Sequence, residues 1–148
     1  MKVLYITDLH GIKWKYEAIY NIIKTKDIDI VINGGDMFPL RPSFFKQDIF
    51  IKNFLDYYFE KFEKKKIFYL CYPGNDDLMI FDSLFKGICR KYYYIRNIAQ
   101  RRFHYQDFEF IGMNWITDLP FGLKDRCRKD NENFIFPKQI GSQFISTL

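Results

Sequence analysis

Cysteine, proline and glycine are scarce in this sequence, and each shortage argues against a class of protein. The three cysteines, Cys71, Cys89 and Cys127, are widely spaced and form no Cys-x-x-Cys pair, which argues against a disulfide framework and a structural zinc site. The 5 prolines and 8 glycines are too few for a fibrous or low-complexity chain. We therefore expect a globular protein whose cysteines are reduced thiols.

Long hydrophobic runs are absent as well. No apolar stretch approaches the roughly 18 residues that a membrane span needs. The opening segment 1–8 resembles the short hydrophobic part of a signal peptide, but Asp8 ends it and no small-residue cleavage site follows. These features predict a cytoplasmic protein with no membrane partner.

The composition is that of a folded and mildly basic domain. Hydrophobic residues make up 48% and charged residues 28%, which excludes intrinsic disorder, and the net charge is +5. Aromatic residues reach 20%, which is typical of nucleic-acid binding in a basic chain, although a coding bias toward Phe, Tyr, Ile and Lys explains the same composition. The basic excess weakly favours anionic partners, phosphates included. No repeat or linker divides the sequence, so we expect a single domain over residues 1–148.

Short apolar runs alternate with longer amphipathic segments in the first part of the chain. The pattern predicts strands over residues 3–6, 28–32 and 67–71, and helices over residues 14–24, 45–65 and 78–89. Strands that are buried on both faces and alternate with helices form a parallel sheet of right-handed βαβ units. The predicted strands then end at the same edge of the sheet, which is where ligands bind in open α/β folds.

The pattern changes after Lys91. A short strand is predicted over residues 92–95, and a hairpin over 101–105 and 108–113 with its turn at Gln106-Asp107. Residues 114–148 show little periodicity, which is unusual inside a compact domain. We therefore expect the chain to stop before its fold is complete.

Residues that bind hard metal ions follow each of the first three predicted strands. The candidates are Asp8 and His10 after the first strand, Asp36 after the second, and Asn75, Asp76 and Asp77 after the third. Any one of them alone is more simply a helix cap or a turn residue. Together, carboxylate, amide and imidazole groups at one edge suit Mn, Fe, Zn or Mg, and a cation removes the repulsion between gathered carboxylates.

The three turns carry a specific resemblance. Asp8-Leu9-His10-Gly11, Gly34-Gly35-Asp36 and Gly74-Asn75-Asp76-Asp77 resemble the first three motifs of the calcineurin-like metallophosphoesterases, with the spacing of that family. Two later segments, Gly112-Met113-Asn114-Trp115 and residues 120–126, resemble a region of some bacterial and phage members. The alternative interpretation of the later segment is a solvated loop.

The resemblance implies a fold, a cofactor and a reaction. The fold is an α/β protein with a metallophosphoesterase-like βαβαβ sheet layered with helices and an incomplete second sheet, a truncated four-layer αββα sandwich. Two divalent ions are implied, with Asp8 and His10 holding the first, Asp36 bridging both and Asn75 holding the second. The implied reaction is in-line hydrolysis of a phosphoester by a metal-activated water, with no covalent enzyme intermediate.

The sequence departs from the family pattern at two places. The His that usually follows the metal-binding Asn is Asp76 here, and an ionised carboxylate is a poor proton donor, which favours phosphodiesters with good leaving groups. Asp76 and Asp77 therefore remain supporting catalytic candidates, and the more plausible role of Asp77 is to orient its loop. The later histidine ligands are missing, because the only other histidine is His104, which we expect to be an ordinary exposed or half-buried side chain.

Each ion is thus short of ligands, and two explanations stay open. Either the chain is the N-terminal part of a longer phosphoesterase, or a second chain or a second copy completes the site. The leading functional hypothesis is a metal-dependent phosphodiesterase acting on a nucleotide or nucleic acid. The alternative is a non-catalytic binding module of the same fold, or an inactive fragment. A nucleotide-binding doubly wound domain is disfavoured, because no Gly-x-Gly-x-x-Gly or Gly-x-x-x-x-Gly-Lys loop follows any strand.

Overall fold

A four-stranded parallel sheet is the centre of the molecule. The computed structural model describes residues 1–117 and 122–128. The sheet has the order β1-β2-β3-β4, formed by β1 (Val3–Ile6), β2 (Ile30–Asn33), β3 (Phe68–Cys71) and β4 (Ile95–Asn97). In its register Ile6 pairs with Asn33 and Asn33 with Cys71, so the first three strands end in one row. The parallel sheet predicted from the sequence is confirmed, and its carboxyl edge is well defined.

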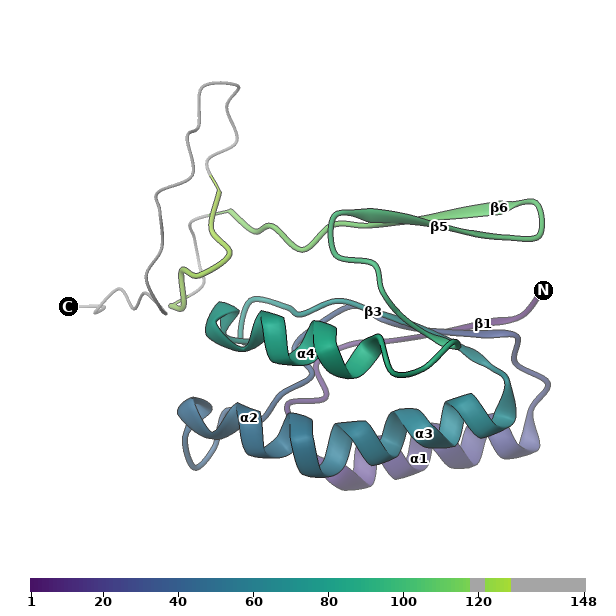
Figure 1. Ribbon diagram of the computed structural model, residues 1–148, viewed down its shortest axis with the longest axis horizontal. Helices are drawn as coiled ribbons and strands as arrows, with labels where there is room; N and C mark the ends of the chain where they lie inside the picture. Colours follow the sequence, from purple (N-terminus) through teal and green to yellow (C-terminus); the bar gives the residue numbers. More distant parts are fainter. Residues whose placement is uncertain (118–121, 129–148) are drawn as a thin grey trace.

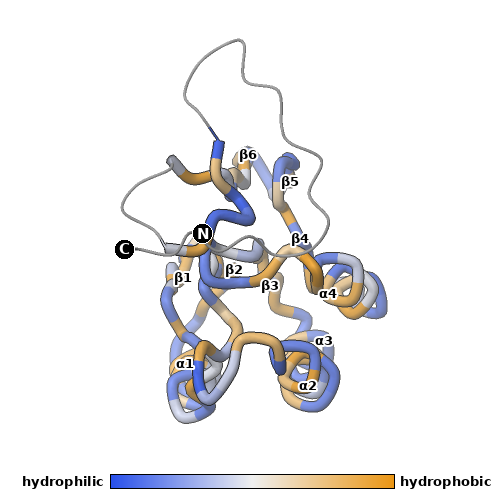
Figure 2. The backbone as a smooth tube through the Cα atoms, turned by 90° about the vertical axis from the view of Figure 1, so that its left-hand side faces the viewer, coloured by the Kyte–Doolittle hydropathy of each residue, from blue (hydrophilic) through white to orange (hydrophobic). Residues whose placement is uncertain are grey.

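All helices pack against one face of this sheet (Figures 1 and 2). The helical segments are α1 (Lys13–Thr25), η1 (Phe44–Lys46), α2 (Gln47–Phe50), η2 (Ile51–Leu55), α3 (Asp56–Lys65), η3 (Met79–Phe81) and α4 (Asp82–Cys89). The predicted helix over 45–65 is therefore a run of four short segments, and η2 within it is a π-helix. The predicted helix over 78–89 begins with the 3₁₀ turn η3. A helical turn that is tighter (3₁₀) or wider (π) than the α-helix leaves no signal in the hydrophobic periodicity of the sequence.

Aromatic side chains fill the space between the helices and the sheet. Tyr58 lies at the centre of this core, with its ring centroid 5.0 Å from that of Tyr16, 5.1 Å from Phe62 and 5.9 Å from Tyr69. All four side chains are buried. Pairs of rings at these distances and tilted angles add packing energy beyond the area that they bury. Much of the aromatic content therefore serves the core, and the loops at the carboxyl edge rest on a rigid base.

The predicted hairpin is confirmed and lies over the opposite face of the sheet (Figure 1). It consists of β5 (Arg101–Tyr105) and β6 (Phe108–Gly112). Phe103 of the hairpin packs on Phe68 of β3 with ring centroids 5.0 Å apart. A small second core forms there around Ile30, Leu70 and Ile98. The hairpin is the only second layer on this face within residues 1–117 and 122–128.

The prediction that every strand is buried on both faces was wrong for β1. Val3 and Tyr5 are 39% and 61% exposed. The reason is position, since β1 is the edge strand and the second core under the hairpin is built on β2 and β3. An apolar run alone cannot distinguish an edge strand from a central one.

The predicted strand over 92–95 was displaced toward its C-terminus, because β4 begins at Ile95. Side chains of α3 hold the preceding residues instead. The hydroxyl of Tyr92 donates to a carboxylate oxygen of Asp56 at 2.8 Å, and the backbone nitrogen of Tyr94 donates to the Glu63 carboxylate at 2.8 Å. The Tyr94 nitrogen is a donor that a longer strand would need, and no local sequence pattern indicates either long-range contact.

Two further expectations concern the cysteines and the membrane. Cys71 and Cys89 carry buried, reduced thiols, as expected. Within the described ranges, none of the helices has the length and apolar character needed to cross a membrane. The expectation of little regular structure over 114–148 lies mostly outside the described residues.

Candidate metal centre

The loops that follow β1 and β2 run side by side and are joined by backbone hydrogen bonds. The nitrogen of His10 donates to the carbonyl of Asp36 at 2.8 Å, and that of Asp8 donates to the carbonyl of Gly35 at 3.2 Å. A third bond, from the nitrogen of Gly11 to the carbonyl of Met37, measures 2.8 Å. The two loops therefore form one rigid unit, although some 25 residues of chain separate them.

This unit gathers the side chains of Asp8, His10 and Asp36. Each offers one ligand atom, and these atoms all lie within 4.8 Å of one another. Asp8 is exposed, His10 is half-buried and Asp36 is 8% exposed, so the group opens to solvent from a buried floor. Three of the sequence-predicted metal ligands are thus brought together at the carboxyl edge of the sheet.

All three residues hold a left-handed backbone conformation. The φ angles of Asp8, His10 and Asp36 are 57°, 48° and 51°. For a residue other than glycine this conformation costs about 1–2 kcal/mol, and it persists only where the surrounding structure imposes it. Three such residues in one cluster indicate a site where side-chain placement outweighs local backbone preference.

Asp36 lies at the junction of the three loops. Its Oδ1 accepts a 2.8 Å hydrogen bond from the backbone nitrogen of Asp76. Burial raises the pKa of Asp36 to about 7, and the negative charges of Asp77 and Asp76 add to this, against the lowering effect of the Asp76 hydrogen bond and of His10. A group of acids that resists ionisation in this way is stabilised by a cation placed among them.

His10 has a buried nitrogen without a partner. Within the described residues its Nδ1 makes no hydrogen bond, and the nearest acidic oxygen, Asp76 Oδ2, lies 4.0 Å away. The other ring nitrogen, Nε2, lies 3.8 Å from Asp8 Oδ1. Buried polar atoms are almost always paired, so an orphaned nitrogen beside carboxylates needs an explanation. The donor set of imidazole and carboxylates fits a divalent cation such as Mn, Fe, Zn or Mg.

The third loop approaches this group through Gly74. Gly35, with a φ of 106°, and Gly74 pack so closely that a Cβ on Gly35 would lie 2.7 Å from the Cα of Gly74. Asn75 follows directly, and its Nδ2 donates to Asp76 Oδ1 at 3.1 Å. Asn75 therefore lies between two residues that contact Asp36, while its assignment as a metal ligand remains a prediction.

Asp77 ties the second loop to the third. Its carboxylate accepts hydrogen bonds from the backbone nitrogens of Phe38 at 2.7 Å, Met37 at 3.0 Å and Gly74 at 2.8 Å. Complete burial raises the pKa of Asp77 to about 6, although these three hydrogen bonds and the charge of Arg126 lower it. These are the contacts of a residue that orients loops, and Asp77 has no path to a substrate because it is fully buried.

Arg126 is an important residue that the sequence did not single out. Its guanidinium donates to the carbonyls of Gly74 at 2.8 Å and Asp77 at 3.0 Å, and to both carboxylate oxygens of Asp82 at 3.0 and 2.6 Å. The side chain is 2% exposed. Arg126 therefore clamps the ends of the third loop onto the start of α4. Only the resemblance of residues 120–126 to a family segment pointed to this region.

The solvated-loop interpretation of that segment is wrong for its described C-terminal part. Lys124, Asp125 and Arg126 are 6%, 0% and 2% exposed. Asp125 accepts a 3.0 Å hydrogen bond from the backbone nitrogen of Met79. Residues 120 and 121 lie outside the described residues. The segment forms part of the scaffold of the third loop.

Two amides complete this scaffold. Gln47 Nε2 donates to the carbonyl of Asp76 at 2.9 Å, while Gln47 Oε1 accepts from the nitrogen of Leu78 at 2.9 Å. Asn114 Nδ2 donates to the carbonyl of Pro73 at 3.0 Å. Gln47 was missed because its partners lie 29 and 31 residues away along the chain, whereas Asn114 belongs to a segment whose resemblance to the family had pointed to it.

His104 remains apart from this group. Its side chain is 72% exposed on the hairpin, and its Nε2 lies 3.2 Å from Glu109 of the facing strand. It therefore behaves as the ordinary exposed histidine that was expected.

Comparisons with known proteins agree with this geometry. A family model described as calcineurin-like phosphoesterase matches residues 1–138. One solved crystal structure is similar with a TM-score of 0.62 at 17% identity, over 84% of this chain and 56% of that chain. At this identity the likeness concerns the fold, and the present chain spans little more than half the length of that structure. No curated protein matches the sequence.

Proposed function

The chain belongs to the calcineurin-like phosphoesterase family, and on that basis we propose that it is a metal-dependent hydrolase of phosphodiesters with two divalent cations. The observation that carries the proposal is the cluster of Asp8, His10 and Asp36, held by left-handed backbone around an unpaired buried nitrogen. A protein with no need for this cluster would gain stability by relaxing it.

The residues divide between the two cations as follows. Asp8 and His10 would hold the first, Asp36 would contact both, and Asn75 would supply an amide oxygen to the second. When bound, such cations neutralise phosphoryl charge and lower the pKa of a water molecule toward neutrality, which provides the nucleophile. The protein itself holds these ligands in place through Asp77 and the hydrogen bonds between the loops.

Asp76 supports the preference for diesters. Its carboxylate is 29% exposed and lies beside His10 and Asn75. The position thus lacks the imidazole that serves most often as a general acid toward a departing alkoxide. Esters whose leaving groups need no protonation are therefore the favoured substrates, and activated phosphodiesters are the nearest test compounds.

A non-catalytic binding module is the second candidate. The observation in its favour is the shortage of ligands, since the chain has only two histidines and His104 pairs with Glu109. If a second copy or another chain supplied the remaining metal ligands, the enzyme hypothesis would again be favoured. We propose a cytoplasmic location, a compartment in which thiols such as those of the buried Cys71 and Cys89 stay reduced.

Hydrolysis of bis(p-nitrophenyl) phosphate tests the proposal directly. We expect turnover that requires Mn²⁺, stops on addition of EDTA, and exceeds turnover of the monoester p-nitrophenyl phosphate. A linear dependence of the rate on protein concentration would indicate that one chain suffices, and a steeper dependence would indicate self-association. Absence of turnover together with absence of Mn²⁺ binding by calorimetry would overturn the proposal in favour of the binding module.

A further inference from the structure

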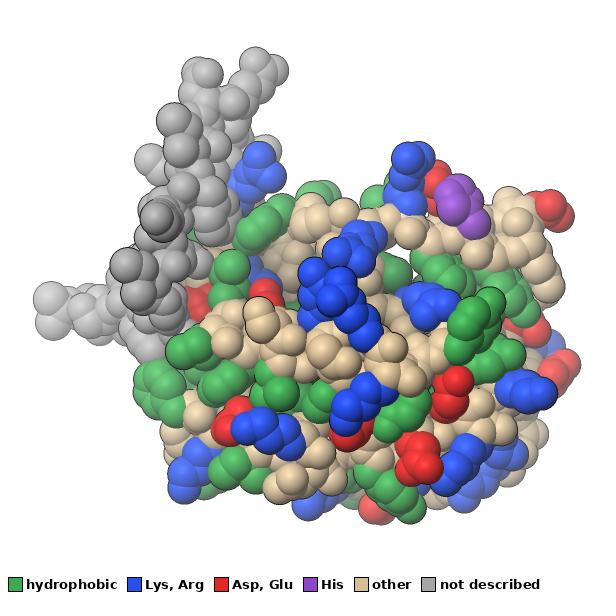
Figure 3. Space-filling model, viewed as in Figure 1, with side chains coloured by type: hydrophobic (Ala, Val, Ile, Leu, Met, Phe, Trp, Pro, Cys, Tyr) green, Lys and Arg blue, Asp and Glu red, His purple; other side chains and the backbone are tan. Residues whose placement is uncertain are grey.

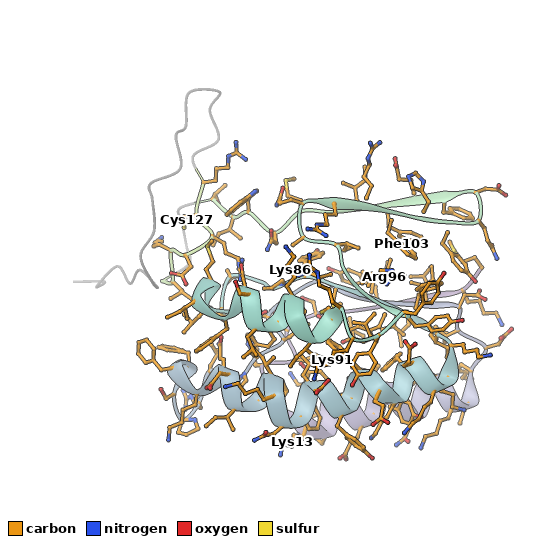
Figure 4. All side chains as sticks on the ribbon, in the orientation of Figure 1. Lys13, Lys86, Lys91, Arg96, Phe103 and Cys127 are labelled. Carbon is orange, nitrogen blue, oxygen red and sulfur yellow. The ribbon has the colours of Figure 1, made fainter. Side chains whose placement is uncertain are left out.

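A groove lined by basic side chains lies between α4 and the chain that connects β4 with β5. Two adjoining cavities of about 300 and about 150 Å³ form it. They share Lys86, Asn97 and Arg101, so they make one continuous surface, which we call the basic groove. Figure 4 shows Lys86 and Arg96 in the space between α4 and the hairpin. Lys and Arg side chains gather on this face of the molecule (Figure 3).

Positive charge predominates in the lining of the basic groove. Its lining contains the four cations Lys86, Arg90, Arg96 and Arg101. The one acid in the lining is Asp82, and both of its carboxylate oxygens already accept hydrogen bonds from Arg126. Among residues 1–117 and 122–128, no carboxylate lies within 4.0 Å of the basic groups of the groove. Unpaired cations that line a concave surface attract phosphate groups.

Aromatic rings border the same groove. The guanidinium of Arg96 lies 4.8 Å from the ring centroid of Tyr93 and 5.9 Å from that of Phe68. Tyr93 is 63% exposed, so much of its side chain is accessible to a ligand. Cations that follow a backbone, with an aromatic surface on which bases stack, are the two features of single-strand binding.

The groove leads to the candidate metal centre. Pro73 lines its larger cavity, and Gly74 and Asn75 follow directly in the third loop. A ligand that extends along the groove would therefore reach the start of the loop that carries the proposed ligand Asn75. Four cations spread over two cavities exceed what one phosphate group needs, which favours a chain of phosphates over a mononucleotide.

We propose that the basic groove binds the phosphate backbone of a single-stranded nucleic acid, with a base stacked on Tyr93. Cavities of this size admit the sugar and phosphate groups of one strand. The binding is a property of the groove alone. That the bound strand is also the substrate rests on the proposed function.

Binding is tested with the full chain and a fluorescent oligothymidylate of about 12 nucleotides, a length within the range that single-strand sites cover. Fluorescence anisotropy in EDTA removes any contribution of metal ions. The double variant Lys86→Gln/Arg101→Gln is compared with Lys26→Gln/Lys65→Gln, which removes the same charge from the exposed ends of α1 and α3. Thermal unfolding establishes that both variants are folded.

We expect the groove variant to bind about tenfold more weakly and the control to bind nearly as well as the wild type. Each phosphate contact contributes about −0.7 to the slope of log K against log salt concentration for a single strand, so the loss of two contacts should reduce the slope by about 1.4. Tyr93→Ala should weaken oligonucleotide binding and leave binding of inorganic polyphosphate unchanged. Equal weakening in the two double variants would overturn the proposal, because net charge alone would then explain the binding.

Two further outcomes separate the groove from the metal centre. Polyphosphate binding as tight as that of the oligonucleotide, with no effect of Tyr93→Ala, would overturn the assignment to nucleic acid. Asp36→Asn should bind the oligonucleotide normally in EDTA, since Asp36 does not line the groove. If the protein hydrolyses the activated diester but leaves a bound oligonucleotide intact in Mn²⁺, the strand is a ligand, and its role as substrate is excluded.

Discussion

The carboxylate of Asp36 accepts a 2.8 Å hydrogen bond from the backbone nitrogen of Asp76, which lies 40 residues further along the chain. The bond joins the loop after β2 to the loop after β3 at the point where the metal ligands are proposed to meet. It also fixes the orientation of the Asp36 carboxyl group. A metal-binding side chain that the protein already holds in one orientation needs little rearrangement when a cation binds.

The first prediction concerns Asp36 itself. In Asp36→Asn the amide oxygen still accepts the Asp76 hydrogen bond, but the charge that we propose two cations share is lost. We expect loss of Mn²⁺ binding in calorimetry and of diester hydrolysis, with an unchanged circular dichroism spectrum. Asp27→Asn is the matched control, because the Asp27 side chain is 95% exposed. Activity that survives Asp36→Asn would contradict the bridging role.

The stability of the metal-free protein should depend on pH. Burial raises the pKa of Asp36 to about 7 and that of Asp77 to about 6, both above the ordinary value of 3.8. Folding therefore favours the protonated acids, and their contribution to stability is lost as pH rises through these values. We expect the free energy of unfolding in EDTA to fall from about pH 4 to about pH 7, the interval between the ordinary and the raised pKa values, and to level off above it. Urea denaturation measures it, and saturating Mn²⁺ should reverse the trend.

Asp77→Asn should destabilise the fold as well as the site. An amide has a single acceptor oxygen, so in either orientation its NH₂ group faces at least one backbone nitrogen that now donates to Asp77, either that of Phe38 or those of Met37 and Gly74. Leaving a buried donor unpaired costs about 1–3 kcal/mol, and we expect a loss in this range in urea denaturation. A change smaller than that of the exposed control Asp27→Asn would show that the three hydrogen bonds carry no energy.

Arg126→Lys tests the clamp on the third loop. Lysine keeps the positive charge but cannot contact Asp82 with two parallel hydrogen bonds and still reach the carbonyls of Gly74 and Asp77. We expect a loss of about 2 kcal/mol of stability and weaker Mn²⁺ binding. Arg128→Lys serves as control, because Arg128 is exposed two residues further along. Unchanged metal affinity in Arg126→Lys would show that the contacts of Arg126 with the third loop do not influence metal binding.

Asp76→His tests the origin of the preference for diesters. A histidine at this position supplies a proton near neutral pH, and positioned general acids accelerate reactions by about 10²–10⁴-fold. We expect the ratio of monoester to diester turnover to rise by at least about tenfold. Asp76→Asn removes the charge without adding a proton donor, so it should leave the ratio low. If the ratio of monoester to diester turnover were unchanged in Asp76→His, the residue at position 76 would not be the cause of the preference for diesters.

The candidate ligands could be predicted because each follows a recognisable strand and turn. Asp8, His10 and Asp36 are found from apolar runs that end in polar turns, and the register of β1, β2 and β3 then brings these turns into one row. Gly35 and Gly74, whose close packing only the structure shows, stand directly before candidate ligands in the same motifs. Local pattern therefore sufficed to predict the parallel sheet and the residues at its edge.

The residues that hold the loops could not be predicted in this way. Arg126 and Gln47 contact the third loop from remote parts of the chain. The local sequence around them is the same as that around an arginine or glutamine exposed to solvent. The π-helix at Ile51–Leu55 and the exposed face of β1 likewise depend on what packs beside them. Burial and pairing at these positions are properties of the assembled layers.

By itself the sequence determined the alternation of strands and helices, the parallel sheet and the chemistry offered at its edge, because these follow from periodicity and residue type over a few neighbours. Only the tertiary structure decided that Asp8, His10 and Asp36 converge on left-handed backbone. It also decided that Asp77 and Arg126 lock the loops, and that four cations line one groove. The physical reason is that hydrogen bonds, burial and charge act between atoms close in space, and folding brings together residues that are 40 or more positions apart.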